Sequence, residues 1–278
     1  MEGWHYYNHA MIPSVWPHEN VDLRPIEDGS IWKVRDGGAP LLARWTSDWD
    51  CREETEFYWC IKDDDFDIAK LKAKLRYEIN KGKKNFETRI IDPREYVDEI
   101  YSVYLDSLKG YPASVRPETR ETIECFANTR WSRQECHFFG VFDKEDGRLC
   151  GYSDVYERGL YLPISSLKCR VESEKKGVNL ALVAGIVEWF VQLNKPGSYL
   201  CDGERNVVHE TNFQSFLIKY FGFRKAYCKL HIVYRPAMKV LVAILFPFRH
   251  RIAKLRNSKM KMVSAVLKME AWKRGLPA

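Results

Sequence analysis

The 278-residue sequence lacks long hydrophobic runs, a targeting segment and internal repeats. Its longest uninterrupted apolar stretch, 240–246, is far shorter than the roughly 20 residues that a membrane-spanning helix needs. Residues 1–17 have neither the basic start nor the apolar centre of a secretory signal. We therefore expect a cytoplasmic protein that is neither a membrane-spanning protein nor a solenoid, with a peripheral location at the inner membrane surface as the alternative.

The cysteines form no pattern typical of zinc binding or of a disulfide framework. All eight are isolated in the sequence, without a C-x-x-C pair or a histidine at zinc-finger spacing. We expect reduced, mostly buried thiols and no metal cofactor. The eight positions are Cys51, Cys60, Cys125, Cys136, Cys150, Cys169, Cys201 and Cys228.

Negative charge is scarce at the C-terminal end of the chain. The whole sequence has 44 Lys and Arg against 38 Asp and Glu, a formal charge of +6. Residues 235–278 contain 11 of these cations and one acid, Glu270, so their net charge of +10 leaves about −4 for residues 1–234. This basic, amphipathic tail could pack on the core as a helical pair, bind a partner, or contact an anionic membrane surface. Without interleaved aromatics it is a weak candidate for nucleic-acid binding.

The first 85 residues are rich in aromatic side chains and alternate in polarity. The pattern predicts strands over 30–35, 41–47 and 56–62, followed by an amphipathic helix over 67–82 that ends at Gly82. Six of the nine tryptophans lie here, and they are more typical of a packed core than of a sugar-stacking surface.

Residues 86–234 predict a mixed α/β (α+β) arrangement with the order β-α-α-β-β-β-α-β-α-β. The helix over 177–194 is apolar almost all round, which is typical of a helix buried against a sheet. Three consecutive strands before it form an antiparallel meander with tight turns at Gly147 and Gly159. The predicted elements are strand 86–91, helices 93–108 and 117–131, strands 136–143, 148–157 and 160–170, helix 177–194, strand 198–202, helix 209–221 and strand 224–234.

This order of elements resembles the GNAT fold of acyl-CoA N-acyltransferases, and Lys219-Tyr220-Phe221-Gly222-Phe223-Arg224 resembles the helix-to-strand junction that closes that fold. The preceding region, with Leu75-Arg76-Tyr77-Glu78-Ile79-Asn80-Lys81-Gly82, is similar to Fem-type peptidyltransferases and their relatives in polysaccharide gene clusters, which pair two GNAT-like units. The resemblance implies a GNAT-like mixed central sheet flanked by helices. It divides the chain into a β-rich N-terminal extension or partial second unit (1–85), a transferase core (86–235) and a helical tail (236–278).

The resemblance also implies how acetyl-CoA or another acyl-CoA would bind. In the family, one strand splays from its neighbour to receive the acyl-pantetheine, and amides at the start of the buried helix hold the pyrophosphate. Only Gly177 of the usual motif is present, because Glu174 and Asn179 occupy two other motif positions; a plain charged loop is the alternative. The implied cofactor-binding residues are Lys168, Arg170, Lys175, Lys176, Gly177, Val178, Asn179 and Asn212.

Amine acylation requires a base for the attacking amine and an acid for the leaving group. Asp154 and Glu157 lie on opposite faces of a meander strand, so one of them could face a cleft, although both could be ordinary strand carboxylates. A polar cluster at 202–212 follows the end of a strand, where α/β folds often place ligands, although it could equally form a turn and a helix cap. The tyrosine that the family often uses as the acid is replaced by Ile218. The candidate catalytic residues are Asp154, Glu157, Asp202, Glu204, His209 and Tyr220.

Three functions remain open at this point. The first is an acyl-CoA-dependent N-acyltransferase, an acetyltransferase in its simplest form, that acts on an amine such as an amino sugar or a cell-envelope glycan precursor. The second is a Fem-like transferase that uses aminoacyl-tRNA and holds the RNA phosphates with its basic tail. The third is a non-catalytic GNAT-like binding module, which the altered motif residues Glu174, Asn179 and Ile218 favour.

Overall fold

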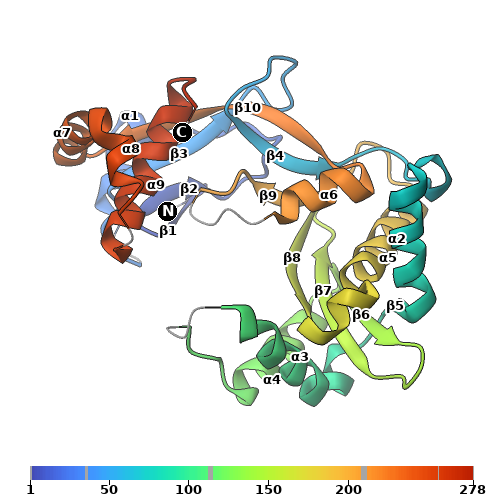
Figure 1. Ribbon diagram of the computed structural model, residues 1–278. Coiled ribbons are helices and arrows are strands. Elements are labelled where there is room, and N and C mark those ends of the chain that lie inside the picture. Colours follow the sequence, from blue (N-terminus) through green and yellow to red (C-terminus); the bar gives the residue numbers. More distant parts are fainter. Residues whose placement is uncertain (1, 35–36, 112–114, 208–211, 256, 278) are drawn as a thin grey trace. The chain divides into compact units, whose positions relative to one another are not determined.

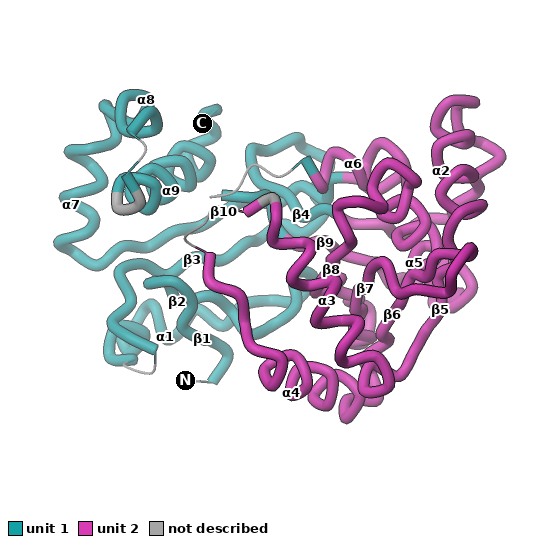
Figure 2. Tube along the Cα trace, turned by 60° about the horizontal axis from the view of Figure 1, so that its bottom comes forward, with its two compact units in different colours: residues 1–60, 204–212, 225–278 teal, residues 61–203, 213–224 magenta. Residues whose placement is uncertain are grey.

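The computed structural model describes residues 2–34, 37–111, 115–207, 212–255 and 257–277. Each of its two compact units is built from segments that are not consecutive in the sequence (Figure 2). The first unit comprises residues 1–60, 204–212 and 225–278, and the second comprises 61–203 and 213–224. The three consecutive domains expected from the sequence do not coincide with these units. The division into those domains stays a prediction.

The second unit contains the predicted β-α-α-β-β-β-α-β-α arrangement. Its strands lie in the order β9-β8-β7-β6-β5, with antiparallel pairing from β5 to β8 and parallel pairing between β8 and β9. Its elements are α2 (Ala73–Asn85), β5 (Phe86–Ile90), α3 (Val97–Ser107), α4 (Arg120–Trp131), β6 (Cys136–Asp143), β7 (Leu149–Tyr156), β8 (Tyr161–Cys169), α5 (Val178–Leu193), β9 (Tyr199–Glu204) and α6 (Phe213–Phe221), with 3-10 turns η2 (Ile68–Lys70), η3 (Pro93–Tyr96), η4 (Leu108–Gly110) and η5 (Val171–Lys176).

Successive side chains of a strand point to opposite sides, so the apolar strands of this sheet present apolar side chains on both faces. Helices cover both of these faces. Phe138 on β6 packs in a cluster with residues of α3 and α4. Its neighbour Phe139 lies on the other face, where its ring meets Trp189 of α5 edge-on at 5.4 Å. The apolar circumference of α5 is explained by this position, since α5 contacts β5, β6 and β7 on one side and α2 on the other (Figure 1).

The first unit is built on the strand order β1-β2-β3-β10-β4. β3 runs parallel to β2 and antiparallel to β10. Its elements are β1 (Trp4–Tyr7), β2 (Ala10–Pro13), α1 (Arg24–Glu27), η1 (Ser30–Lys33), β3 (Leu42–Ser47), β4 (Phe57–Lys62, which ends in the second unit), β10 (Arg224–Tyr234, which begins there), α7 (Pro236–Leu245), η6 (Phe246–Phe248), α8 (Arg249–Ile252) and α9 (Ser258–Lys273).

The C-terminal helices contribute to the core of the first unit. Trp272 on α9 is 3% exposed, and its ring lies 5.9 Å from that of Phe57 on β4. Leu267 and Ala271, also on α9, pack against Val242 and Phe246. One face of the basic tail is therefore buried, as the helical-pair alternative predicts.

Two sequence predictions need correction. Residues 30–35 were expected to form a strand, but Ser30–Lys33 forms the 3-10 turn η1, because Gly29 adopts a left-handed φ of 72° and the Asp28 carboxylate accepts the Ser30 amide at 2.8 Å. The helix expected over 67–82 begins at Ala73 and continues past Gly82 to Asn85. Gly82 does not end this helix, because it lacks the left-handed φ of a helix-ending glycine. Its missing side chain instead allows close packing, as shown below.

The described residues contain no helix that is both long enough and apolar enough to cross a bilayer. Within the same ranges, no group of three or more His, Cys, Asp or Glu side chains could hold a metal ion. The eight cysteines are free thiols and five of them are buried, which confirms the expectation of mostly buried thiols.

Candidate functional site

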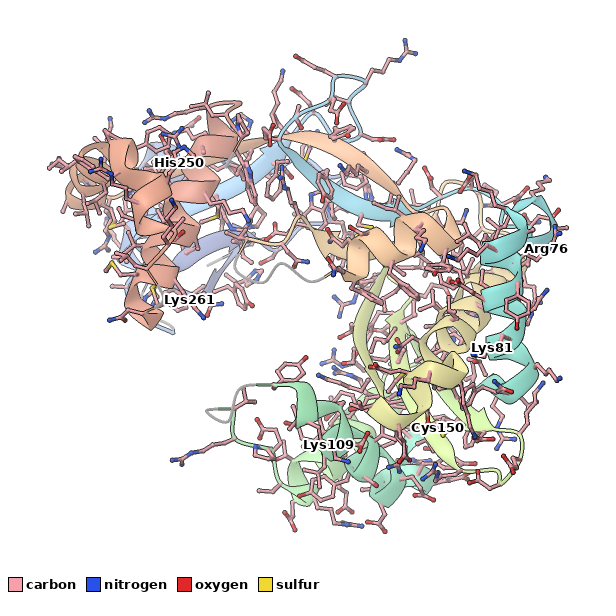
Figure 3. All side chains as sticks on the ribbon, in the orientation of Figure 1. Arg76, Lys81, Lys109, Cys150, His250 and Lys261 are labelled. Carbon is pink, nitrogen blue, oxygen red and sulfur yellow. The ribbon has the colours of Figure 1, made fainter. Side chains whose placement is uncertain are left out.

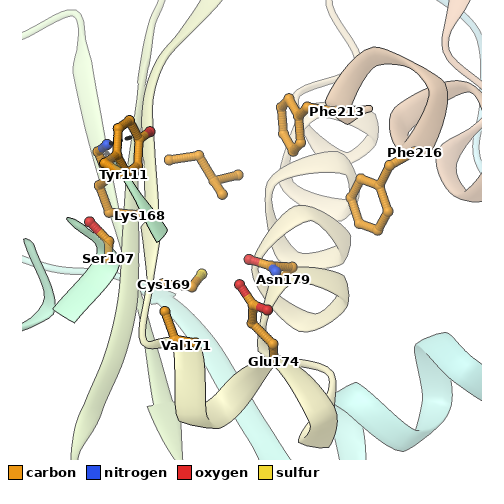
Figure 4. Close-up of a pocket in the computed structure, with 10 residues that line it drawn as sticks. Ser107, Tyr111, Lys168, Cys169, Val171, Glu174, Asn179, Phe213 and Phe216 are labelled. Atoms are coloured by element: carbon orange, nitrogen blue, oxygen red, sulfur yellow. Dashed lines mark hydrogen bonds between the residues drawn. The ribbon is translucent and has the colours of Figure 1, made fainter. Parts of the chain in front are cut away.

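A cavity of about 250 Å³ lies within the second unit, between β8, the start of α5 and the first turns of α6 (Figure 4). The end of α3 and the turn that follows it complete the wall. Hydroxyl, amine, thiol, carboxylate, amide and aromatic groups all reach its surface. The lining residues are Ser107, Tyr111, Leu167, Lys168, Cys169, Val171, Glu174, Asn179, Phe213 and Phe216.

The cavity opens where the pairing of β8 and β9 stops. Only the first three residues of β8, Tyr161 to Pro163, pair with β9. Both strands continue beyond that point, and β8 remains paired with β7 on its other edge as far as Cys169. Leu167, Lys168 and Cys169, which line the cavity, lie in the part of β8 beyond this pairing. The arrangement agrees with the splayed strand that the GNAT resemblance implies.

The wall formed by β8 carries one cation and one protonated thiol. Lys168 Nζ lies 5.0 Å from the centre of the Tyr111 ring and 3.4 Å from its hydroxyl oxygen. Burial, reinforced by the nearby Glu174 carboxylate, raises the pKa of the Cys169 thiol far above its usual range. Cys169 is therefore neutral near pH 7, and it lines the cavity as a small apolar group rather than as a nucleophile.

The opposite wall combines a carboxylate with the N-terminus of α5. Gly177 caps the helix in a left-handed conformation, with φ at 93°, and no side chain caps the first-turn amides. The Gly177 N–H donates to the carbonyl of Glu174 at 3.0 Å, which closes the turn. Glu174 and Asn179 both face the cavity from this turn (Figure 4). An anion at the helix start would therefore meet favourable amides and an unfavourable Glu174 carboxylate.

The two lysines expected to hold phosphate, Lys175 and Lys176, have different partners. Lys176 donates to Asp143 at 3.2 Å, and this hydrogen bond raises the pKa of Lys176. Lys175 is exposed, and its carbonyl accepts a hydrogen bond from Lys81 at 3.0 Å. Glu172, in the same turn, pairs with Arg148 at 3.0 Å. None of these six charged residues lines the cavity.

Helix α2 packs directly on the cap of α5. A Cβ atom on Gly82 would lie 2.6 Å from the carbonyl oxygen of Gly177, and one on Gly177 would lie 3.0 Å from the Gly82 Cα. Asn85 adds a hydrogen bond to the Lys176 carbonyl at 2.9 Å. The turn before α5 is thus fixed from outside by α2, while Glu174 and Asn179 face the cavity.

The remaining predicted cofactor-binding residues lie elsewhere. Arg170 donates to the Leu149 carbonyl at 3.1 Å and to Ser102 at 3.0 Å, toward β7 and α3. Val178 is fully buried. Asn212 is exposed and belongs to the first unit. Of the predicted set, Lys168 and Asn179 are the two residues that the cavity brings together.

The two carboxylates predicted on the meander strand are engaged in ion pairs away from the cavity. Asp154 is fully buried, and the Arg130 Nε lies 2.9 Å from its Oδ2. Burial raises the pKa of Asp154, and the guanidinium opposes this rise. Glu157 pairs with Lys195 at 2.7 Å, a hydrogen bond that lowers the pKa of Glu157. Neither residue lines the cavity.

Asp202 has the electrostatic character of a proton acceptor. Burial at the end of β9 raises its pKa to about 7, and a hydrogen bond with Gln214 opposes the shift. Gln214 is buried on α6, where its sequence neighbours Phe213 and Phe216 line the cavity; Asp202 itself is not one of the lining residues. A carboxyl with a pKa near neutrality can both take and return a proton under working conditions.

The other candidates of the polar cluster have separate partners. Glu204 belongs to the first unit and forms a two-pronged ion pair with Arg44. The Tyr220 hydroxyl donates to Glu78 and accepts from Lys219 at 3.2 Å. His209 lies outside the described residues. The candidate catalytic roles of all six residues stay predictions.

The sequence does not place seven of the lining residues in a site: Ser107, Tyr111, Leu167, Cys169, Val171, Phe213 and Phe216. No motif or spacing marks them, and tertiary packing brings those of α3, α6 and the turns to β8. Glu174 did carry a signal, because it replaces the residue that a phosphate-binding turn normally has.

No protein-family profile matches the sequence, and no curated protein does either. Solved structures do match. L-PGS from Bacillus licheniformis is 14% identical, with a TM-score of 0.57 over 98% of this chain and 85% of that chain. FemX is 8% identical, with a TM-score of 0.56 over 87% of this chain and 85% of its own.

A third solved structure is the C-terminal DUF2156 domain of an Agrobacterium fabrum protein named as a lysylphosphatidylglycerol synthetase. It is 11% identical, with a TM-score of 0.52 over 87% of this chain and 84% of that chain. GNAT acetyltransferases also match, over smaller shares of the chain. The fold is shared with L-PGS, FemX and the DUF2156 domain, which confirms the GNAT-like fold with Fem-type features predicted from the sequence.

Proposed function

We propose that the protein is an acyl-group transferase whose donor is an aminoacyl ester of the kind carried by charged tRNA. Its acceptor is an amine, on a small molecule or a glycan precursor. The observation that carries the proposal is the Glu174 carboxylate, which lines the cavity beside the turn where a CoA-dependent relative would bind pyrophosphate. The similarity to a protein named as a lysylphosphatidylglycerol synthetase supports the transfer of an aminoacyl group, because the lipid in that name carries a lysyl group.

The cavity offers complementary groups to an aminoacyl donor. A free α-ammonium pairs with Glu174, and the Asn179 amide can donate to a carbonyl oxygen on the same wall. Phe213 and Phe216, stacked at 5.8 Å, provide an apolar surface for the amino-acid side chain. A volume of about 250 Å³ suits an aminoacyl group whose carrier remains outside.

The proposed reaction is a direct acyl transfer. The acceptor nitrogen attacks the ester carbonyl carbon, a C–N bond forms, and the C–O bond to the carrier breaks. The nitrogen loses a proton, and the leaving oxygen of the carrier gains one. Because Cys169 remains protonated, the step proceeds without a covalent thioester on this chain.

Asp202 is the proposed acceptor of the proton released by the amine. Its pKa of about 7 matches the task, since a base works best when its pKa is close to the working pH. Gln214 links it to the helix that carries Phe213 and Phe216. Asp154 and Glu157 are less suited to this role, because each is held by a cation.

An acyl-CoA donor, acetyl-CoA in the simplest case, is the second candidate. The first-turn amides of α5 have no side-chain cap, and this feature specifically favours an anion at that position. Lys168, on the opposite wall, could meet the donor carbonyl. Against this donor stands the Glu174 carboxylate, which would repel a pyrophosphate at the same turn.

Calorimetric titration with two probes separates these donors. The first probe is puromycin, a stable amide analogue of the aminoacyl-adenosine end of charged tRNA, and the second is acetyl-CoA. We expect puromycin to bind, and Glu174→Gln to weaken its binding about fivefold, the effect of a solvent-accessible ion pair worth ~1 kcal/mol. The same substitution should tighten acetyl-CoA binding if that compound is the donor, because it removes a repulsive charge.

Glu172→Gln is the matched control, because Glu172 lies two residues away in the same turn but outside the cavity. It should leave the affinity for puromycin unchanged. If acetyl-CoA binds and puromycin does not, or if Glu172→Gln has the same effect as Glu174→Gln, the aminoacyl proposal is wrong.

A further inference from the structure

A row of large apolar side chains lies exposed along α7 and the turns that follow it, within the first unit. Val240 and Ile244 are each 60% exposed, Phe248 is 51% exposed and Leu241 is 44% exposed. Val240 and Ile244 are four residues apart on α7, so they share one side of that helix, and Phe248 ends the 3-10 turn η6 that follows it. We call these four residues, with the neighbouring cations Lys239, Arg251 and Lys254, the α7–α8 face.

The core of the protein does not account for this face, because the core uses the opposite side of α7. Val242 and Phe246 are 3% and 7% exposed, and they pack against Leu267 and Ala271 of α9. Helix α7 is thus apolar on both sides, although one side alone is buried. An exposed apolar row of this kind is typical of a binding surface.

The charges on the chain segment that carries the row have a single sign. Lys239 precedes Val240 on α7, Arg251 lies on α8 and Lys254 follows α8; all three are exposed, as is His250 on α8, labelled in Figure 3. The sequence has no Asp or Glu from 235 to 269. Glu270, the one acid of the tail, is 5% exposed and is held by Tyr234 at 2.9 Å and Arg274 at 2.8 Å.

We infer that the α7–α8 face binds the surface of a bilayer that contains anionic lipids. Its apolar side chains enter the boundary between headgroups and acyl chains, and its cations lie at the lipid phosphates. This combination of an apolar row with cations and no acid is complementary to an anionic interface. The inference does not depend on the proposed transferase function.

Other occupants fit the face less well. A second copy of the chain would bring two sets of cations together, which is unfavourable. RNA would satisfy the cations but would leave Val240, Ile244 and Phe248 in water, because phosphate attraction needs no apolar contact. The bilayer is the occupant that uses both features of the face.

Co-sedimentation of the full-length protein with vesicles tests the inference. We expect binding to vesicles of equimolar phosphatidylglycerol and phosphatidylcholine, little binding to phosphatidylcholine alone, and a decrease with added salt. The triple variant Lys239→Gln, Arg251→Gln, Lys254→Gln should weaken binding by about fivefold for each cation removed. The double variant Ile244→Gln, Phe248→Gln should weaken it about tenfold, since two half-exposed apolar side chains no longer enter the interface.

Matched variants in the second unit are the controls. Lys70→Gln, Lys72→Gln, Lys74→Gln removes the same charge from exposed positions, and Tyr77→Gln, Ile90→Gln removes exposed apolar surface, 69% and 49% exposed in the parent. Both should bind vesicles like the parent, and all variants should keep the parent circular dichroism spectrum.

Three results would overturn the inference. The first is equal loss of vesicle binding in the control variants, which would indicate attraction by net charge alone. The second is a dimer in analytical ultracentrifugation that Ile244→Gln, Phe248→Gln dissociates while vesicle binding is unchanged. The third is binding to tRNA, in place of vesicles, that the triple cation variant abolishes.

Discussion

In the proposed function, Glu174 is the residue that selects the donor. In a CoA-dependent enzyme, the turn before the buried helix offers amides and cations to a pyrophosphate. Here the turn presents a carboxylate to the cavity, while Lys176 pairs with Asp143 outside it. This placement of Glu174 is the reason why we propose a donor that carries an ammonium group.

Asp202 should make the stability of the protein depend on pH in an unusual direction. Its pKa rises from 3.8 to about 7 on folding, so between these values the folded state keeps a proton that the unfolded state has released. The free energy of unfolding should therefore fall as pH rises from about 4 to 7. The shift corresponds to about 4 kcal/mol, which partial exposure reduces to about 2 kcal/mol.

Denaturant titrations across this pH range, on the parent and on Asp202→Asn, measure the effect. The variant should lose the decrease, because asparagine has no proton to release. Glu157→Gln is a control of opposite sign, since Lys195 lowers the pKa of Glu157 and the resulting stabilisation is lost as pH falls. The raised pKa of Asp202 would be contradicted if, with Glu157→Gln as the background, the unfolding free energy did not decrease between pH 4 and 7.

At the scale of elements, the contact between α2 and the cap of α5 fixes the site from outside. Gly82 and Gly177 approach so closely that a Cβ atom added to either residue would press against the backbone of the other. Because backbone cannot move aside as a flexible side chain can, the two elements would have to separate. The geometry of the turn that carries Glu174 therefore depends on a glycine nearly a hundred residues away in the sequence.

Gly82→Ala tests this dependence. The new methyl group would lie 2.6 Å from the Gly177 carbonyl oxygen, so we expect a loss of about 1–3 kcal/mol of unfolding free energy, although alanine favours helix more than glycine does. Lys84→Ala, at an exposed position of the same helix, is the control and should change stability by less than about 0.5 kcal/mol. A Gly82→Ala protein as stable as the parent would show that the contact is not tight.

Elements with a strong periodic pattern were predictable from sequence. The strand 224–234 was placed at its observed bounds, and the apolar run of 177–194 correctly indicated the buried helix α5. The strand predicted over 30–35 was wrong, because the Asp28-Gly29 turn imposes a 3-10 conformation on the residues that follow it. The site was harder to predict, because Phe213, Phe216 and Tyr111 reach it through tertiary packing.

At the scale of the whole molecule, the positive charge is concentrated in residues 235–278, and none of these residues lines the cavity. The +10 tail contributes Trp272 and Leu267 to the core of the first unit, so it is not a detachable appendage. Removing it would expose that core and test folding rather than binding. Point variants on the exposed α7–α8 face are the appropriate probes for this reason.

The two compact units are also built from interleaved segments, since the chain passes between them near residues 61, 204, 213 and 225. Their boundaries in space differ from any division of the sequence into consecutive parts. The cavity and its proposed base belong to the second unit, whereas the α7–α8 face belongs to the first. The transferase proposal and the membrane proposal can therefore fail independently.

A crystal structure of the protein soaked with puromycin would test whether the cavity binds an aminoacyl group. We predict density for the aminoacyl group in the cavity between β8 and α5, with its amino nitrogen within hydrogen-bond distance of a Glu174 carboxylate oxygen. An empty cavity would contradict the claim. So would a parallel soak in which CoA binds with its pyrophosphate at the first amides of α5 and Glu174 turned away.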